Sequence, residues 1–554
     1  MGFETLLNLI RSGRDFDQAA LLPCLCHESR EERGRVNYQL AEAFAQAGNY
    51  KQAKVFIDRA WSFSNFSEEV FDLYKQVCEK NDDIGSLREA YKRQGMRHAR
   101  EGRIEQALAA FNQWQYAFAT HYHLDKYAYD IDVLECIESL AQPFKFNEYQ
   151  VSNRSAGQNK LRLAYLVYGA AHANSVLVKI NQVFAKYHDK RIFDVAFFIP
   201  ESNLSRKQIQ ECERIFKSCG VGLFFAPRYC KENRLVTCAR QIHEFQPDIL
   251  ITSAALAEFE HYFIALLRPA PLVIGLLQGP PQQFTAQGLD YAISWSRHPQ
   301  IDSPIDTSFV KLGVTLPDPT AVPRTSRATI GIPDDAVVLM SAGRNVKFQN
   351  ADFWKNIAVL MNAYPDIYYV AVGVERSQIL CLIDSDISSI EKRIRFLGWR
   401  KDCVSLLTIA DILIDTYPSG GGHVLVDAMA LGVPFVSFAN NYLHAFDQTD
   451  WSVAEEFVNI PELIVPRGDF HRFAEVAGRL ISDKSYRKEM SDKCARQIRL
   501  EMPTEEAGVR ALEREYIRLS KTGPIRAQGA SHSSSVKGQQ TFSLRKLIKN
   551  YLAR

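Results

Sequence analysis

The sequence lacks any run of about 18 or more uncharged apolar residues, the length that a membrane-spanning helix needs. It also lacks an excess of charge of one sign, because 66 Lys and Arg residues oppose 64 Asp and Glu residues, for a formal net charge of +2. The first absence argues against a membrane span. The second argues against nucleic acid as the main partner, which calls for concentrated positive charge.

A cysteine framework and a secretion signal are missing as well. The 11 cysteines are odd in number and have no repeated spacing, which fits free thiols in a reducing compartment. Glu4 and Arg11 lie in or beside the first apolar stretch, and no small-residue cleavage site follows it. Since 46% of the 554 residues are hydrophobic, the chain can form several cores. We expect a cytoplasmic, soluble, multidomain protein.

Residues 1–157 are expected to be almost entirely helical, since no proline lies between Pro23 and Pro143. Two segments have the spacing of tetratricopeptide (TPR) repeats, in which small residues let antiparallel helices touch and a glycine ends the first helix. The turn glycines are Gly48 and Gly102. The two copies carry Leu40, Ala41, Phe44, Ala53, Ile57 and Ala60, and Tyr91, Gly95, His98, Ala107, Phe111 and Trp114. The alternative is an ordinary helical domain with chance spacing.

From Lys160 onward, apolar runs of strand length alternate with segments of helix length. Continuous apolar strands of this kind indicate parallel sheets that are covered on both faces. The expected strands are 161–169, 192–200, 248–254, 271–277 and 290–295, and then 336–343, 367–373, 393–398, 411–418 and 434–440. A proline-rich stretch separates the two series. We therefore predict two doubly wound α/β domains, 158–322 and 323–521, which bind ligand at the carboxyl ends of their strands.

The most informative segment is DILIDTYPSGGGHVLVDAMALGVPFVSF, residues 411–438. A predicted strand leads into a glycine-rich turn that opens a helix, where free N–H groups and the helix dipole favour a phosphate. The candidate phosphate-binding residues are Ser419, Gly420, Gly421, Gly422 and His423. Asp427 follows one helical turn later, where its carboxylate is placed to accept hydrogen bonds from ribose hydroxyls. The alternative is a tight corner with no ligand.

Further motifs accompany this segment: RLAYLVYGAAHANS (162–175), PDILITSA (247–254), LLRPAPLVIGLLQGPP (266–281) and GIPDDAVVLMSAGRNVK (331–347). Together they resemble the O-linked N-acetylglucosamine transferases, whose wider family includes plant O-fucosyltransferases and bacterial cytoplasmic N-glycosyltransferases. The resemblance covers about residues 160 to 520. It implies a TPR-like helical region followed by a GT-B fold of two facing Rossmann-like domains.

The resemblance also implies an inverting glycosyltransferase that uses a nucleotide-diphosphate sugar and no metal. It implies two catalytic residues, Lys347 as the phosphate-binding lysine and His172 as a residue that orients acceptor or sugar or acts as general base. Other residues expected at the nucleotide sugar are Arg344, Gly398, Trp399 and Arg400. The alternatives are a place in the core for Trp399 and a local hydrogen bond for His172.

The chemistry agrees with a metal-free site, because a departing nucleoside diphosphate builds negative charge that Lys347 and the N–H groups of Gly421 and Gly422 would stabilise. A metal-type spacing, Asp384-Ser385-Asp386, falls between predicted strands, where we expect a solvated face. Cys403 stands where animal members have a base-contacting histidine. Val424 and Leu425 replace two hydroxyl residues, for which Thr416 and Ser419 are candidate substitutes.

We predict transfer of a single sugar, with N-acetylglucosamine favoured, from a UDP-sugar to Ser or Thr of a protein. Transfer of glucose to Asn, or of fucose from a GDP-sugar, are alternatives within the same family. Two alternatives belong to other classes: a catalytically inactive TPR scaffold, and a lipid or polysaccharide glycosyltransferase.

The helical region is expected to bind the acceptor protein on a concave surface. Trp114, Tyr116 and Tyr122 are either aromatic contacts for that protein or core residues. Residues 522–554 are expected to form a disordered linker and a short basic amphipathic tail, 542–554. That tail would lie on an anionic membrane, dock on a partner or stay frayed in solvent.

Overall fold

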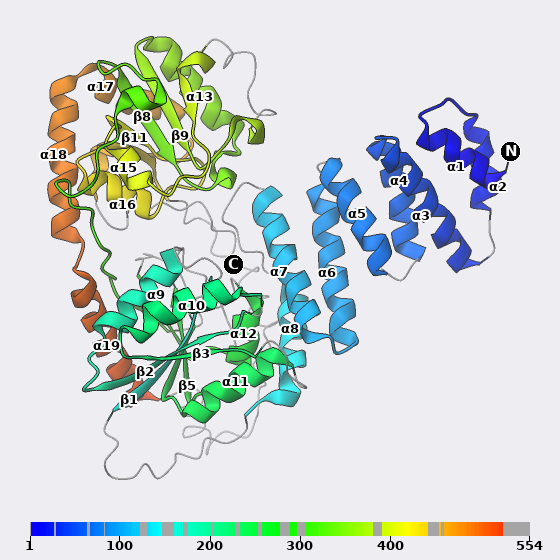
Figure 1. The fold of residues 1–554 in the computed structure, drawn as a ribbon, viewed down its shortest axis with the longest axis horizontal. Coiled ribbons are helices and arrows are strands. Elements are labelled where there is room, and N and C mark those ends of the chain that lie inside the picture. Colours follow the sequence, from blue (N-terminus) through cyan, green and yellow to red (C-terminus); the bar gives the residue numbers. More distant parts are fainter. Residues whose placement is uncertain are drawn as a thin grey trace, which may run out of the picture. The chain divides into compact units, whose positions relative to one another are not determined.

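The computed structural model in Figure 1 divides into two compact units, Met1–His121 with Asp132–Leu140, and the remainder of the chain. The structure describes residues 2–26, 29–63, 67–81, 83–121, 130–146, 160–167, 169, 176–201, 203–227, 233–252, 258–277, 288–295, 306–379, 390–440, 454–455 and 459–523. In the described part of the chain, no helix combines the length and the apolar character that crossing a membrane requires.

The first unit is helical, as predicted. Its helices are α1 (Phe3–Arg11), α2 (Leu21–Leu25), α3 (Arg30–Gln46), α4 (Tyr50–Phe63), α5 (Glu68–Lys80), α6 (Ile84–Arg100), α7 (Ile104–His121) and α8 (Ile131–Ala141). Gly48 and Gly102 follow α3 and α6 with φ of +75° and +71°, left-handed conformations that suit glycine. A Cβ on Gly95 would lie 2.4 Å from the Phe111 ring, so α6 and α7 touch because this residue is small. The TPR-like pairing α3–α4 and α6–α7 is thus confirmed.

The aromatic residues of α7 were predicted to contact an acceptor or to lie in the core. Trp114 is 2% exposed, and the Arg88 guanidinium lies 5.0 Å from the centre of its ring. Trp114 is therefore a core residue. The side chain of Tyr116 and the whole of Tyr122 lie outside the described residues.

The first sheet of the second unit has seven parallel strands in the order β3-β2-β1-β4-β5-β6-β7. The strands are β1 (Leu161–Leu166), β2 (Phe193–Ile199), β3 (Gly222–Phe225), β4 (Ile249–Thr252), β5 (Leu272–Leu277), β6 (Tyr291–Ser294) and β7 (Thr307–Phe309). Helices α9 (Val176–Tyr187), α10 (Arg206–Lys217), α11 (Arg234–Phe245) and α12 (Phe259–Leu266) alternate with them.

The second sheet has six parallel strands in the order β10-β9-β8-β11-β12-β13. They are β8 (Val337–Ala342), β9 (Ile367–Val372), β10 (Ile394–Phe396), β11 (Ile412–Ile414), β12 (Phe435–Phe438) and β13 (Ile464–Val465). Its helices are α13 (Ala351–Ala363), α15 (Cys403–Leu407), α16 (His423–Ala430), α17 (Phe470–Ser482) and α18 (Lys484–Glu501). In both sheets the strand order reverses once, between β1 and β4 and between β8 and β11. A ligand crevice opens at such a switch point.

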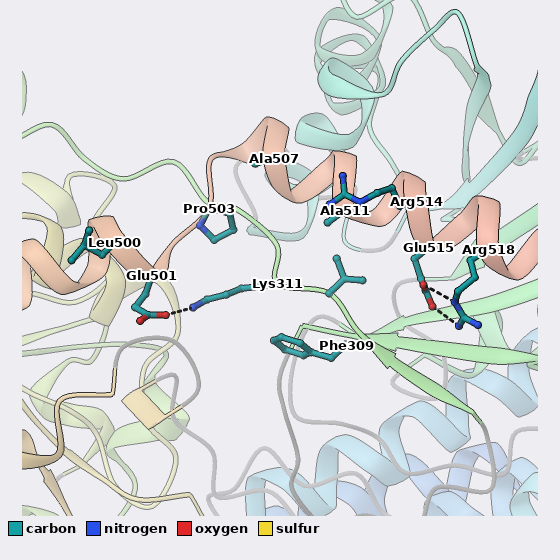
Figure 2. Close-up of a pocket in the computed structure, with 11 residues that line it drawn as sticks. Phe309, Lys311, Leu500, Glu501, Pro503, Ala507, Ala511, Arg514, Glu515 and Arg518 are labelled. Carbon is teal, nitrogen blue, oxygen red and sulfur yellow. Dashed lines mark hydrogen bonds and ion pairs between the residues drawn. The ribbon is translucent and has the colours of Figure 1, made fainter.

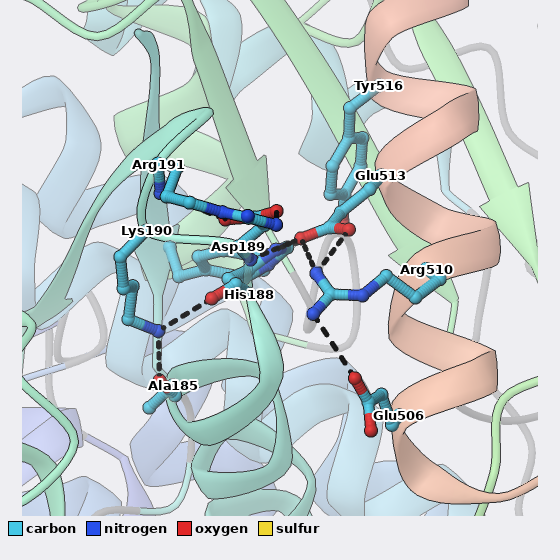
Figure 3. Close-up of polar contacts among 10 residues, drawn as sticks. Ala185, His188, Asp189, Lys190, Arg191, Glu506, Arg510, Glu513 and Tyr516 are labelled. Atoms are coloured by element: carbon cyan, nitrogen blue, oxygen red, sulfur yellow. Dashed lines mark hydrogen bonds and ion pairs between the residues drawn. The ribbon is translucent and has the colours of Figure 1, made fainter.

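The last helix, α19 (Glu505–Thr522), returns to the first sheet, where it packs on α9. A buried polar network fixes it there (Figure 3). His188 Nε2 lies 2.7 Å from the Tyr165 hydroxyl on β1, and His188 Nδ1 lies 3.1 Å from Glu513 Oε1 on α19. Arg510 donates to both carboxylate oxygens of Glu513, at 3.0 and 2.8 Å. Burial lowers the pKa of His188, and the Glu513 carboxylate opposes this shift. This histidine therefore links the sheet to the helix through hydrogen bonds at both ring nitrogens.

Candidate functional site

The switch point of the second sheet brings Lys347 to the glycine loop. Lys347 lies in a short 3-10 helix, Asn345–Phe348, which follows β8, and the loop connects β11 to α16. The Lys347 ammonium donates a hydrogen bond to the carbonyl oxygen of Gly420. A Cβ on Gly343 would lie 3.3 Å from Lys347 Cδ, so a glycine there leaves room for the lysine stem. Two segments that are far apart in the sequence therefore meet at one strand edge.

The buried side of the loop is hydrogen-bonded to Asp415, which is not among the predicted site residues. This aspartate directly follows β11 and is 2% exposed. Its carboxylate accepts hydrogen bonds from the N–H groups of Gly421 and Thr416 and from the Ser437 hydroxyl, the last at 2.6 Å. Burial raises the pKa of Asp415, while these bonds and the charge of Lys347 lower it. Asp415 therefore sets the shape of the loop from inside the protein.

Two glycines of the loop meet different surroundings. A Cβ on Gly421 would lie 2.6 Å from Val424 Cγ1, which leaves no room for a side chain. A Cβ on Gly422 would meet nothing within 4 Å, so the backbone is open on that side. Gly422 precedes α16, and among the described residues no side chain caps this helix. An uncapped helix start with open space in front of it suits an anion.

Three more glycines gather where β8, β9 and β10 end. The Gly373 N–H donates a hydrogen bond to the Gly398 carbonyl oxygen at 2.7 Å. The Gly343 N–H donates one to the Val372 carbonyl oxygen at 3.0 Å. Gly373 has φ of +95°, and a Cβ on it would lie 1.8 Å from the Gly343 carbonyl oxygen. Gly398 has φ of +56°. The backbones approach this closely because no side chains intervene, which places Gly398 near the Lys347 turn.

The side chains predicted near the nucleotide are on the surface. Trp399 is 76% exposed, which rules out the alternative that it is a core residue. Arg400 is exposed and pairs with Asp402 at 2.7 and 2.8 Å, and Arg344 is exposed at the start of the Lys347 turn. All three follow the carboxyl end of a strand in the second sheet, the edge at which ligands bind in this architecture.

His423 and Asp427 lie one turn apart on α16, as predicted. Burial raises the pKa of Asp427 to about 6, and the charge of Lys179 on α9 opposes this rise. Burial also lowers the pKa of His423, and Lys179 lowers it further. The Cys403 thiol has a pKa raised to about 11 by burial and by the nearby Asp427 carboxylate. Trp295, which follows β6, brings its ring within 6.4 Å of the His423 ring, centre to centre.

Several predicted site residues either lie outside the described residues or are buried within the loop. His172 and the Asp384-Ser385-Asp386 stretch lie outside the described residues. Thr416 was a candidate substitute for a missing phosphate-binding hydroxyl. Its hydroxyl is buried and donates to the Ser419 carbonyl oxygen at 2.7 Å, so it is used within the loop. Ser419 itself is 2% exposed. Both side chains are buried, so neither residue presents its hydroxyl at the surface of the loop.

A cavity of about 640 Å³ lies away from this loop, where β7 and the following linker pass α18 and α19 (Figure 2). Its walls include Phe309, Leu500 and Pro503. The charged groups that line it are largely paired, since Lys311 lies 3.3 Å from Glu501 and Glu515 lies 2.7 Å from Arg518. The cavity contains no residue of the glycine loop. The site is therefore defined by the strand ends and not by this cavity.

Comparison with known proteins gives one family match. Residues 324–497 match the family model described as "Glycosyl transferases group 1". No curated protein sequence matches the chain. Among solved structures, a mutant of the O-GlcNAc transferase from Thermobaculum terrenum is similar over 94% of this chain and 98% of its own, with 13% identity and a TM-score of 0.59.

Two other solved structures are similar at lower scores. A glycosyltransferase from Rickettsia africae covers 66% of this chain and 98% of its own, with 13% identity and a TM-score of 0.49. The lipopolysaccharide outer core galactosyltransferase WaaB covers 65% of this chain and 100% of its own, with 14% identity and a TM-score of 0.45.

The helical region, the two Rossmann-like domains and the match of the second domain define the class. The protein has the GT-B fold and is a glycosyltransferase.

Proposed function

We propose that the protein transfers one sugar, N-acetylglucosamine in the first instance, from a UDP-sugar to Ser or Thr of an acceptor protein, with inversion and without a metal. The contact of Lys347 with the glycine loop at the switch point carries this proposal. It joins a cation to an open, uncapped helix start, which is the combination that a diphosphate needs. The similarity in fold to an O-GlcNAc transferase supports the choice of sugar and acceptor.

In the proposed reaction, an acceptor hydroxyl oxygen bonds to the anomeric carbon while the bond from that carbon to the β-phosphate oxygen breaks. The electron pair stays on the leaving diphosphate, and the hydroxyl proton goes to a base, for which His172 is the candidate. Lys347 and the N–H groups at Gly421 and Gly422 would stabilise the charge on the leaving group. The positive end of α16 adds to this field.

The remaining residues are assigned to the nucleotide. The Asp427 carboxylate would accept hydrogen bonds from the ribose hydroxyls. Gly398 would contact the base through its backbone, and the exposed Trp399 and Arg400 would flank the base from the same loop. Arg344, exposed beside Lys347, would contact the diphosphate or the sugar. The helical unit would bind the acceptor protein, and residues 542–554 would contact a membrane or a partner.

The first test is calorimetric binding of UDP and GDP to the full chain in EDTA. We expect UDP to bind and GDP to bind more weakly, after which a panel of UDP-sugars and NMR of the product would give the sugar and the anomeric outcome. A preference for GDP would make fucose the donor. Absence of binding by either nucleotide, with and without Mg²⁺, would contradict the proposed donor site and favour an inactive scaffold.

A second test addresses Asp415. Asp415→Ala leaves the Gly421 N–H and the Ser437 hydroxyl without their buried acceptor, which costs about 1–3 kcal/mol for each group. We expect a lower melting temperature and at least tenfold weaker UDP binding. Asp415→Asn keeps one oxygen for the Gly421 N–H and offers an amide to Ser437, so its effect should be clearly smaller. Equal effects of the two substitutions would show that hydrogen bonding at Asp415 does not shape the loop.

A further inference from the structure

Helix α9 bears a lysine, Lys179, whose charge acts on the start of α16. Its residues Val178 and Ile180 are buried, whereas Lys179 between them is exposed. In the part of the chain that the structure describes, the Lys179 ammonium forms no hydrogen bond or ion pair. α9 begins beyond the carboxyl end of β1, the strand edge at which ligands bind in the first sheet.

Contacts place this part of α9 beside the glycine-loop helix. Ile180, which follows Lys179, lines a small cavity together with Trp295. Trp295 in turn faces His423, the first residue of α16, with ring centres 6.4 Å apart. The charge of Lys179 lowers the pKa of both His423 and Asp427, so its ammonium acts on both ends of the first turn of α16.

Both α/β domains therefore contribute positive charge near the glycine loop and the start of α16. The second sheet supplies Lys347 and the positive end of α16, and the first sheet supplies Lys179. A lysine placed next to a helix start is unfavourable without an anion between them. The carboxylates of Asp427 and of Asp415, on which the charge of Lys347 acts, balance part of this charge. An anionic ligand would balance the rest.

We infer that Lys179 contacts the diphosphate of the nucleotide sugar from the first domain, opposite Lys347 in the second. This inference rests on the proposed donor site. Lys179 then binds the donor between the two domains, and its contribution depends on the phosphates and not on the base or ribose. A charge-assisted hydrogen bond of this kind changes affinity by about ten- to a hundredfold.

The test is Lys179→Met in the full chain, with Lys186→Met on the same helix as the matched control. Binding of UDP is measured by calorimetry and binding of uridine by ligand-observed NMR. We expect Lys179→Met to weaken UDP about ten- to a hundredfold and to leave uridine unchanged. Lys186→Met should behave as wild type for both ligands, and Lys179→Arg should keep UDP binding within a few-fold of wild type.

The outcomes separate this inference from the proposed function. If wild type binds UDP and Lys179→Met binds it equally well, the inference is wrong while the donor site stands. If Lys179→Met weakens the binding of UDP and of uridine by the same factor, the effect of the substitution is structural and the inference is also wrong. If wild type itself binds no UDP, the proposed function fails, and the role of Lys179 fails with it.

Discussion

Lys347→Ala should reduce sugar transfer about 10²- to 10³-fold and weaken UDP binding at least tenfold. The reason is the position of the ammonium, which donates a hydrogen bond to the Gly420 carbonyl oxygen, beside Gly421 and Gly422. Arg467 also touches the loop, but at the carbonyl oxygen of Pro418. Charge that develops on the leaving diphosphate is stabilised most by a donor that is already in place. Single-turnover kinetics with a saturating UDP-sugar would measure the rate, and calorimetry the affinity.

The matched control is Lys355→Ala, which removes an exposed lysine from α13 in the same domain and should leave both quantities unchanged. Lys347→Arg should recover part of the binding, since it restores charge, but little of the rate, since a planar guanidinium directs its N–H groups differently from an ammonium. Full activity in Lys347→Ala would remove this lysine from the reaction and leave the loop N–H groups as the main donors.

Much of the fold followed from the sequence because its pattern is local. Continuous apolar runs predicted ten strands of two parallel sheets, and each contains a strand of the structure. The strands that were not predicted, β3, β7 and β13, are two to four residues long and lie at or beside sheet edges. A strand that pairs on one side needs less apolar sequence, so it gives a weaker signal.

The site was predictable where it depends on a single segment or on the order of strands. The glycine loop, His423 and Asp427 belong to one strand–turn–helix unit, and Lys347 joins them because parallel strands end at one edge. Asp415 lay within the predicted strand 411–418, but its buried bonds to the loop were not foreseen. Lys179 and Trp295 were missed because their approach to α16 depends on tertiary contacts between distant segments. No periodicity in the sequence records such contacts.

The largest expected change in pH behaviour belongs to Asp427. Burial raises its pKa from the usual 3.8 to about 6. If the ionised carboxylate accepts the ribose hydroxyls, binding of the donor should weaken as the pH falls through about 6. Asp427→Asn should bind the donor at least tenfold more weakly at pH 7.5 and show no step near pH 6. UDP-N-acetylglucosamine is the ligand to use, because each of its phosphates is substituted on both sides and keeps only one strongly acidic oxygen, which stays ionised throughout this range.

Three neighbouring groups bear on this profile: His423 on the same helix, Cys403 on α15 and Lys179 on α9. The Cys403 thiol, with a pKa of about 11, does not titrate near pH 6. A step that persists in Asp427→Asn would therefore belong to His423 and would contradict the assignment. Asp335→Asn, at an exposed aspartate of the same domain, is the control and should retain the wild-type profile.

Asp427→Asn should weaken donor binding but stabilise the folded protein. A loss of binding combined with a gain in stability is what we expect of a carboxylate kept for function. Because the pKa of Asp427 is higher in the folded than in the unfolded chain, the folded state binds the proton more tightly. Above about pH 6 the ionised group lowers stability by about 3 kcal/mol, a penalty that disappears as the pH falls toward 4. Asp427→Asn should raise the melting temperature at pH 7.5 and have little effect near pH 4. A variant that loses both donor binding and stability would instead make Asp427 a structural residue of α16.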